Sequence, residues 1–357
     1  MRVSIIPVLV FLVLLYGCES SGDISKLTDN SSVSQADSNN ALVTKNVTTD
    51  TSIVIQGKRY KIVTNAYLDS SDAIEYYNYT YHDNKIDSSI NHGYNGYYSI
   101  SLVSVDLTDT LFTAHFDKKI FKNEIYGEIL ARANAVTPDF VAYLPEFNSL
   151  VFTLEIWVPE SDWGQQALIM INTEGNITEA AWNNSYGGSG CDNKIIISKD
   201  GKIMASCGSI YNANKTIARL DSGKFERVLT ELLSDSTFLV VYEQNDTTNR
   251  KNAIVLDKNF KSLNRFTYKG YYNILGFICP RFKSNNTLYL LNSDVPSLYA
   301  VHSNGNHEVI DLNKCEKLTG PIKVSEKKFN VYTEFGDFTF ALDTIHHKIR
   351  WKTDKQY

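Results

Sequence analysis

The sequence predicts an all-β fold built from a repeated unit, and three observations support this prediction. Tyrosine (22 residues) and phenylalanine (17) are abundant while proline (7) is scarce, a composition that favours strands. From Ile53 onward, short apolar runs alternate with turn residues. A strand–turn–strand pattern also recurs, and a polar residue begins its turn at Asp106, Asn172, Asp221, Asp257, His302 and Asp343.

The spacing of these turns predicts the architecture. Successive turns lie about 36 to about 66 residues apart, and most intervals fall near the roughly 40–50 residues of a propeller blade. Each unit has room for two hairpins, hence four strands. We therefore predict a β-propeller of about six four-stranded blades, with the strand-like residues 52–63 pairing with the last blade to close the ring. Paired β-sandwich domains are the alternative.

One turn gives a family resemblance. Ser198-Lys199-Asp200-Gly201-Lys202 resembles the S-P-D-G-K turn of TolB-like (WD-like) propeller repeats, with Lys199 in place of the usual proline. As a pattern, the resemblance covers roughly residues 95–351. It implies a six-bladed propeller that uses one face for protein contact. The segment before the repeats has no room for the separate α/β domain of TolB, so the Tol-complex role is not implied.

A short helix is predicted inside the repeat series. Ile125, Ile129, Leu130 and Ala133 recur at helical spacing between residues 123 and 135. Such an insertion explains the long interval between the first two turns.

The N-terminus predicts export and a lipid anchor. Arg2 precedes an apolar run from Ile5 to Leu15, which is too short to span a membrane and is typical of a cleavable signal. Leu15-Tyr16-Gly17-Cys18 resembles the lipobox of bacterial lipoproteins, although Tyr16 is larger than the residue usual there. The resemblance implies cleavage before Cys18 and lipids, palmitate among them, on that cysteine.

The predicted organisation follows from this N-terminus. Residues 1–17 form a signal peptide, 18–52 a lipidated cysteine with a disordered tether, and 53–357 the β-propeller domain. Because Glu19 is not the aspartate associated with inner-membrane retention, we expect a bacterial cell-envelope protein anchored in the outer membrane. Whether its head faces the periplasm or the exterior stays open.

Four cysteines follow Cys18 and permit disulfides in an exported chain: Cys191, Cys207, Cys279 and Cys315. Three connectivities are possible, the pairs nearest in sequence are 191–207 and 279–315, and buried thiols are the alternative. With no C-x-x-C pair we expect no metal, and no cofactor motif is present.

The expected function is binding without intrinsic catalysis. The net charge of -5 and the lack of a basic cluster argue against nucleic acid. Aromatic and amide side chains that suit a sugar or a peptide gather near loops of one unit, although core packing is their alternative role: Trp157, Asp162, Trp163, Trp182, Asn183 and Tyr186. We expect a monomeric head that binds an envelope protein or glycan.

The alternative function is a propeller-type glycan hydrolase or lyase, with catalytic residues that converge from several blades. Its first candidates are His82, His92 and His115.

Overall fold

The computed structural model describes residues 41–357, apart from short gaps at 83–84, 107, 187–190, 192–194, 215–216, 221–226, 245–250, 274–275, 294–295, 334–335, 347 and 355–357. Cys18 and the signal peptide therefore lie outside the described residues, as does most of the tether. The described residues belong to one compact unit of the chain.

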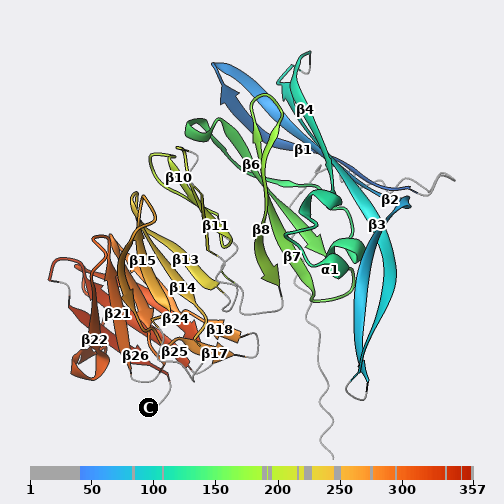
Figure 1. The fold of residues 1–357 in the computed structure, drawn as a ribbon. Coiled ribbons are helices and arrows are strands. Elements are labelled where there is room, and N and C mark those ends of the chain that lie inside the picture. Colours follow the sequence, from blue (N-terminus) through green and yellow to red (C-terminus); the bar gives the residue numbers. More distant parts are fainter. Residues whose placement is uncertain are drawn as a thin grey trace, which may run out of the picture. The chain divides into compact units, whose positions relative to one another are not determined.

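The fold is all-β, as predicted, and four-stranded sheets dominate it (Figure 1). In the described part of the chain, the strands form six four-stranded sheets and one two-stranded sheet. Five of the six are simple meanders, in which each strand pairs with the next one along the chain.

The first two sheets contain β1 (Ala41–Ile55), β2 (Lys58–His82), β3 (Lys85–Ser104) and β4 (Thr110–Asp117), then β5 (Asp139–Leu144), β6 (Ser149–Trp157), β7 (Gly164–Asn172) and β8 (Ile177–Tyr186). The next two contain β9 (Ile196–Ile197), β10 (Ile203–Ala205), β11 (Ser209–Asn212) and β12 (Ile217–Arg219), then β13 (Arg227–Ser234), β14 (Thr237–Tyr242), β15 (Ala253–Asp257) and β16 (Ser262–Phe266). The two-stranded sheet is β17 (Tyr271–Asn273) with β18 (Gly276–Ile278). The final two contain β19 (Arg281–Ser284), β20 (Thr287–Leu291), β21 (Ser297–His302) and β22 (His307–Asp311), then β23 (Glu316–Lys317), β24 (Glu326–Thr333), β25 (Gly336–Asp343) and β26 (Ile349–Thr353). Three 3-10 turns accompany them: η1 (Lys118–Phe121), η2 (Pro145–Phe147) and η3 (Leu312–Lys314).

The turns at Asn172, Asp257 and Asp343 fold as predicted, whereas the turn at His302 is capped by Asn304, whose Oδ1 atom accepts the backbone N–H of Asn306 at 3.0 Å. Asn172 Oδ1 accepts the backbone N–H groups of Glu174 and Asn176, at 3.2 and 2.8 Å, and so closes the β7–β8 turn. Asp257 and Asp343 accept two backbone N–H groups each in the same way. Asp221 lies outside the described residues. These side chains are turn caps, because a short polar side chain satisfies the donors that a tight turn leaves open.

Residues 52–63 do not close a ring with the last sheet. They belong to β1 and β2, which pair with each other from Ser52↔Lys61 to Ile55↔Lys58. The last sheet takes its fourth strand from β23 instead, which runs parallel to β26. The strand β1 also begins at Ala41, inside the segment predicted as tether, because its β-branched residues find a partner in β2.

The predicted helix is present and short. The single α-helix among the described residues, α1 (Gly127–Arg132), lies within the predicted 123–135 segment. Arg132 forms an ion pair with Glu128 at 2.8 Å on its outer side. Its inner side packs against β3, so closely that a Cβ on Gly93 would lie 2.1 Å from the carbonyl oxygen of Ala131.

The apolar core lies between successive sheets. The first two sheets and α1 share the largest cluster of buried side chains. Other clusters join the second sheet to the third, the third to the fourth, the fourth to β18, β20 and β21, and the β19–β22 sheet to the last. Each of these sheets therefore buries apolar side chains against the next sheet along the chain.

Candidate functional site

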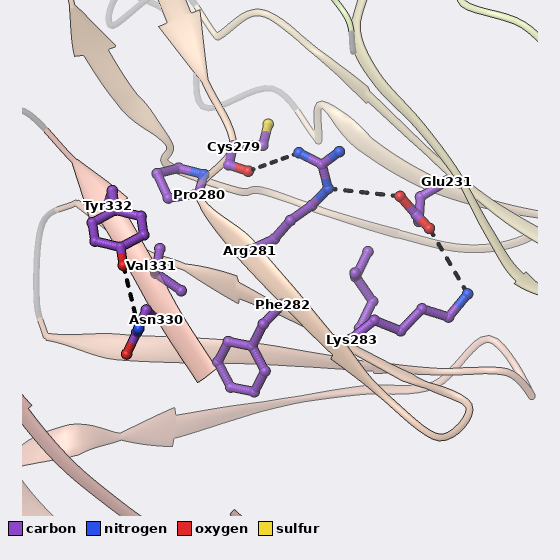
Figure 2. A pocket seen from close by; sticks show the side chains of 10 residues that line it. Glu231, Cys279, Pro280, Arg281, Phe282, Lys283, Asn330, Val331 and Tyr332 are labelled. Atoms are coloured by element: carbon purple, nitrogen blue, oxygen red, sulfur yellow. Dashed lines mark hydrogen bonds and ion pairs between the residues drawn. The ribbon is translucent and has the colours of Figure 1, made fainter. Parts of the chain in front are cut away.

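One candidate site is a cavity of about 460 Å³ that we call the first-strand pocket (Figure 2). Its lining comes mainly from β13, β19 and β24. The strands β13 and β19 begin their meanders, and β24 begins the β24–β25–β26 meander. The polar side chains around the pocket are Glu231, Arg281, Lys283, Asn330 and Tyr332.

Two cations face one carboxylate in this pocket. The Nε atom of Arg281 lies 3.6 Å from Glu231 Oε2, and the Nζ atom of Lys283 lies 3.8 Å from Glu231 Oε1. Arg281 also donates a hydrogen bond to the carbonyl of Cys279, and Lys283 donates one to the carbonyl of Leu232. The side chains of Arg281 and Glu231 are 21% and 19% exposed, so solvent still reaches this positively charged group.

The alternation of β19 produces this arrangement. Arg281 and Lys283 share one face of the strand, because successive side chains point to opposite faces. Phe282 lies between them in sequence and is buried, with its ring stacked on those of Tyr289, Phe329 and Phe340. The aromatic stack fixes the strand that presents the two cations.

The first sheet carries a second candidate site, a cavity of about 760 Å³ that we call the tyrosine pocket. Strand pairing places six of its lining residues in two neighbouring rows across β2, β3 and β4. The rows are Tyr67–Tyr97–Asp117 and Asn65–Ser99–His115. Within each strand the two residues are separated by one position, so all six side chains lie on one face of the sheet.

Hydrogen bonds hold one end of the tyrosine pocket. The carboxylate of Asp72 accepts from Lys119 Nζ at 2.7 Å, from Asn95 Nδ2 at 2.7 Å and from the hydroxyl of Tyr97. These bonds, that from Lys119 first, hold the pKa of Asp72 well below its usual range. The bond to Asp72 raises the pKa of Tyr97 to about 12, so the phenol stays protonated.

Two buried polar atoms in the lining of the tyrosine pocket have no hydrogen-bond partner among the described residues. They are the Oδ1 atom of Asn65 and the hydroxyl of Tyr98. Tyr98 is 2% exposed, and burial raises the pKa of its hydroxyl. Buried polar atoms in folded proteins are nearly always satisfied, so the Asn65 oxygen, which lies on the same sheet face as the two rows, marks a place where a ligand can form a bond.

Among the residues predicted from sequence, Trp157, Asp162 and Trp163 lie together at the β6–β7 turn. The indole of Trp157 donates to the carbonyl of Ser161 at 2.7 Å, and a Cβ on Gly164 would lie 2.7 Å from its ring. Asp162 is exposed and Trp163 is 37% exposed. Trp157 therefore packs inside its own turn and offers little ring surface to a ligand.

Trp182 and Asn183 have structural contacts. Asn183 is completely buried on β8, where its Oδ1 atom accepts the backbone N–H of Cys207 at 3.2 Å and its amide donates to Gln166. The guanidinium of Arg227 lies 5.1 Å from the ring centre of Trp182. The bond from Cys207 to Asn183 connects β8 to the β10–β11 turn. The side chain of Tyr186 lies outside the described residues.

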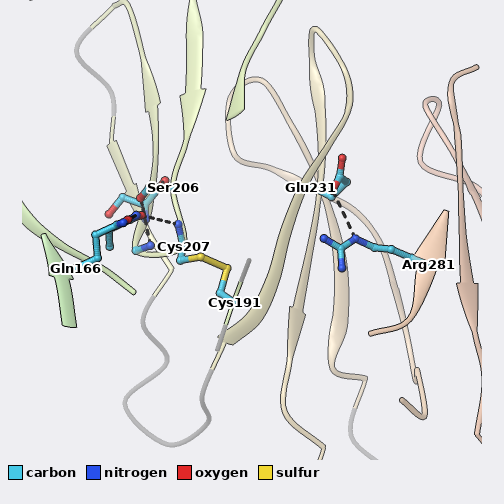
Figure 3. Close-up of a disulfide and its surroundings, with 9 residues drawn as sticks. Gln166, Cys191, Ser206, Cys207, Glu231 and Arg281 are labelled. Atoms are coloured by element: carbon cyan, nitrogen blue, oxygen red, sulfur yellow. Dashed lines mark hydrogen bonds and ion pairs between the residues drawn. A yellow bond between two sulfur atoms is a disulfide. The ribbon is translucent and has the colours of Figure 1, made fainter. Parts of the chain in front are cut away.

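The structure joins Cys191 to Cys207 in a disulfide, with 5.9 Å between their Cα atoms (Figure 3). Cys279 and Cys315 carry thiols, in place of the second bridge that an even number of cysteines permits. They pack in different apolar clusters, Cys279 with the fourth sheet and Cys315 with the last two sheets, which keeps them apart. Burial raises the pKa of the Cys315 thiol, which makes it less reactive.

Of the three histidines proposed for catalysis, His92 and His115 do not share one site. His115 lies in the tyrosine pocket, whereas His92 is 3.9 Å from Glu75 on the exposed hairpin. The side chain of His82 is outside the described residues. Across the described part of the chain, no group of three or more His, Cys, Asp and Glu side chains is placed to hold a metal ion.

Of the residues that line the two pockets, sequence reasoning identified only His115 as a candidate for ligand binding or catalysis. A signal was present in the alternating segments Asn65-x-Tyr67, Tyr97-x-Ser99, His115-x-Asp117 and Arg281-x-Lys283. Each shows a polar or aromatic pair on one strand face, but pairing across strands is needed to bring them together.

Comparison with known proteins gives no match by family model or by curated sequence. Among solved structures it is similar to a protein of Bacteroides fragilis called "putative exported protein", with 12% identity and a TM-score of 0.27 over 54% of this chain and 69% of the other. A TM-score this low carries no argument about fold or function. No helix in the described residues is both long enough and apolar enough to cross a membrane.

Proposed function

We propose that this chain is a lipid-anchored binding module of the bacterial cell envelope, whose β-propeller head holds an envelope protein or glycan without intrinsic catalysis. The lipobox-like Leu15-Tyr16-Gly17-Cys18 supports the anchor at Cys18. Glu19 supports the outer membrane as its location. A single polypeptide head with its own apolar core is consistent with a monomer.

The propeller is the architecture that best fits the packing. Propeller blades are four-stranded meanders that bury apolar side chains against the next blade, and the sheets of this chain pack in the same way. In a propeller the first strand of each blade lines the central channel. The first-strand pocket, lined by β13, β19 and β24, is the feature that such a channel would produce.

The observation that carries the binding function is the charge of the first-strand pocket. Arg281 and Lys283 both lie beside the carboxylate of Glu231, so two cationic side chains and one carboxylate line the pocket. A planar guanidinium beside an ammonium suits a carboxylate or phosphate group on the partner. We therefore expect the partner to present an acidic group to this pocket.

The alternative function, a glycan hydrolase or lyase, receives less support from this pocket. Glycoside hydrolysis generally needs two carboxylates on either side of the scissile bond. In the described lining, Glu231 is the one carboxylate, and it is paired with two cations.

The test is crosslinking and co-purification from native cell envelopes. The intact chain is compared with Cys18→Ser, which cannot carry the lipid, and with the double variant Arg281→Gln/Lys283→Gln. Lys314→Gln is the matched control, since Lys314 is 84% exposed and lies outside the pocket.

A stoichiometric partner that is captured with the intact chain and the control, and is lost with the double variant, would support the proposal. If the double variant captures the partner as well as the intact chain does, the first-strand pocket does not bind the partner. Membrane fractionation tests the anchor separately, because Cys18→Ser should release the chain from the membrane fraction.

A further inference from the structure

We infer that the tyrosine pocket binds a neutral saccharide, with its tyrosine rings against the sugar ring and its polar side chains bonded to the hydroxyl groups. This site extends the proposed binding function, and it uses none of the residues of the first-strand pocket. The cavity of about 760 Å³ falls within the roughly 300–1,000 Å³ that is usual for small-ligand sites.

The two tyrosines form an aromatic surface whose position is already fixed. Tyr67 and Tyr97 are directly opposite each other on β2 and β3, and their rings stack with centres 5.2 Å apart and an interplanar angle of 14°. The bond from Tyr97 to Asp72 fixes that ring, while Tyr67 stays 41% exposed. A ligand that stacks here loses little side-chain freedom on binding, which favours affinity.

This aromatic surface suits a sugar ring better than a charged group. One face of a pyranose presents C–H bonds, which carry slight positive charge, and the face of an aromatic ring is electron-rich. Ile120 and Ile177 add an apolar wall to the same cavity. Stacking and apolar contact are thus available without any charge on the ligand.

The second row supplies the polar partners that a saccharide needs. Asn65, Ser99 and His115 lie across the three strands beside the tyrosines. Asn65 donates to the Ser99 hydroxyl at 3.2 Å, which leaves its buried Oδ1 atom without a partner among the described residues. A sugar hydroxyl can donate to this oxygen, and hydroxyl groups can both donate to and accept from the serine and the histidine.

The carboxylates select against anionic ligands. Asp117 lines the cavity, and Asp72 stands behind Tyr97. Asp72 is balanced by Lys119, but the hydrogen bonds to Asp117 come from neutral donors, the amide of Asn95 at 3.1 Å and the backbone N–H of Lys119 at 2.9 Å. An acidic sugar or a phosphate would meet this charge, whereas a neutral sugar can donate its hydroxyl hydrogens to it.

The test is a titration of the full chain with neutral oligosaccharides of glucose, galactose and N-acetylglucosamine, and with an oligosaccharide of glucuronic acid as the anionic comparison. Isothermal calorimetry measures affinity. The variants are Tyr67→Ala, which removes the stacking ring, Tyr67→Phe, which keeps it, and His115→Ala in the second row. Tyr79→Ala is the matched control, because Tyr79 is 57% exposed on the same hairpin outside the pocket.

We expect saturable binding of at least one neutral oligosaccharide with a dissociation constant of about a millimolar or tighter. Tyr67→Ala and His115→Ala should each weaken it about tenfold or more, while Tyr67→Phe and the control leave it nearly unchanged. Binding of no neutral oligosaccharide, preference for the glucuronic acid oligomer, or full affinity in Tyr67→Ala would overturn the inference. Partner capture through Arg281 and Lys283 is unaffected by these variants, so the two proposals fail independently.

Discussion

Raising the pH from 7 to 9.5 should stabilise this protein through one buried lysine, Lys118. Its side chain is completely buried in η1, and its ammonium donates to the carbonyl oxygens of Tyr94, at 2.9 Å, and Ala133. A Cβ on Gly96 would lie 2.9 Å from the Lys118 side chain, so the space around it is tightly filled. Burial lowers the pKa of Lys118 to about 8.

The size of the effect follows from the two protonation states. An unfolded lysine has a pKa of about 10.4, so between pH 8 and 10 the unfolded chain binds a proton that the folded chain has released. Charged Lys118 therefore disfavours the folded state, and this penalty shrinks as the pH rises through that window. Integration from pH 7 to 9.5 gives a gain of about 2 kcal/mol in the free energy of unfolding.

The assay is urea unfolding at pH 7 and at pH 9.5, for the wild-type chain and for Lys118→Met. Methionine fills the space of the lysine stem but leaves two carbonyl oxygens without a donor, a cost of about 1–3 kcal/mol each that does not depend on pH. The Cys315 thiol, whose pKa is raised, should lower stability with rising pH in both proteins, so its effect cancels in the difference. If both proteins respond equally to pH, the reasoning about Lys118 is wrong.

Three further predictions concern stability. Cys191→Ser removes the bridge to Cys207, 16 residues away, and should lower the free energy of unfolding by about 3 kcal/mol. The measurement is the melting temperature, which should be lower in the variant and should fall to the same value in the wild-type chain only when a reductant is present. Gly93→Ala forces a Cβ onto the Ala131 carbonyl and should cost about 1–3 kcal/mol or more, with faster hydrogen exchange in α1 as the check that the damage is local. Asn183→Ala leaves the Cys207 N–H without its acceptor and should cost about 1–3 kcal/mol by urea unfolding, whereas a loss below the precision of the assay would mean that this bond adds nothing.

The features that sequence predicted well are those with local causes. An aspartate or asparagine that caps its own turn needs only the next four residues, so Asn172, Asp257 and Asp343 were identifiable from their neighbours alone. The helix is local too, because the Glu128–Arg132 spacing and the apolar stripe lie within one short segment. The all-β class follows from composition and from these turns together.

The features that sequence missed depend on distant partners. Nothing within β1 indicates that it begins at Ala41, because the segment is rich in Ser, Thr and Asn and becomes a strand only by pairing with β2. The 25 residues of β2 likewise exceed the length available to one strand in a four-stranded repeat unit, and the length of β2 is set by pairing with β3. Arg281 and Lys283 could not be identified from the sequence for the same reason, because their partner Glu231 lies on another sheet.

The binding residues chosen from the sequence differ from those that line the pockets, for a related reason. Tryptophans beside amides are conspicuous in a sequence. In the structure, however, the indole of Trp157 donates to a backbone carbonyl, and the amide of Asn183 bonds to the backbone of Cys207 and the side chain of Gln166. The tyrosines of the first sheet were counted as evidence for strands. Only their pairing shows that Tyr67 and Tyr97 stand opposite each other rather than on separate faces.

Register connects the tyrosine pocket to the core beneath it. Ala66, Tyr98 and Phe116 alternate with the residues of the two rows, and the side chains of all three are buried on the other face of the sheet. A slip of one residue in the pairing would exchange the two faces and expose these side chains to water. The energy of burying that core therefore also fixes Tyr67 beside Tyr97. For this reason, substitutions in the exposed rows can test ligand binding while the opposite face continues to hold the register.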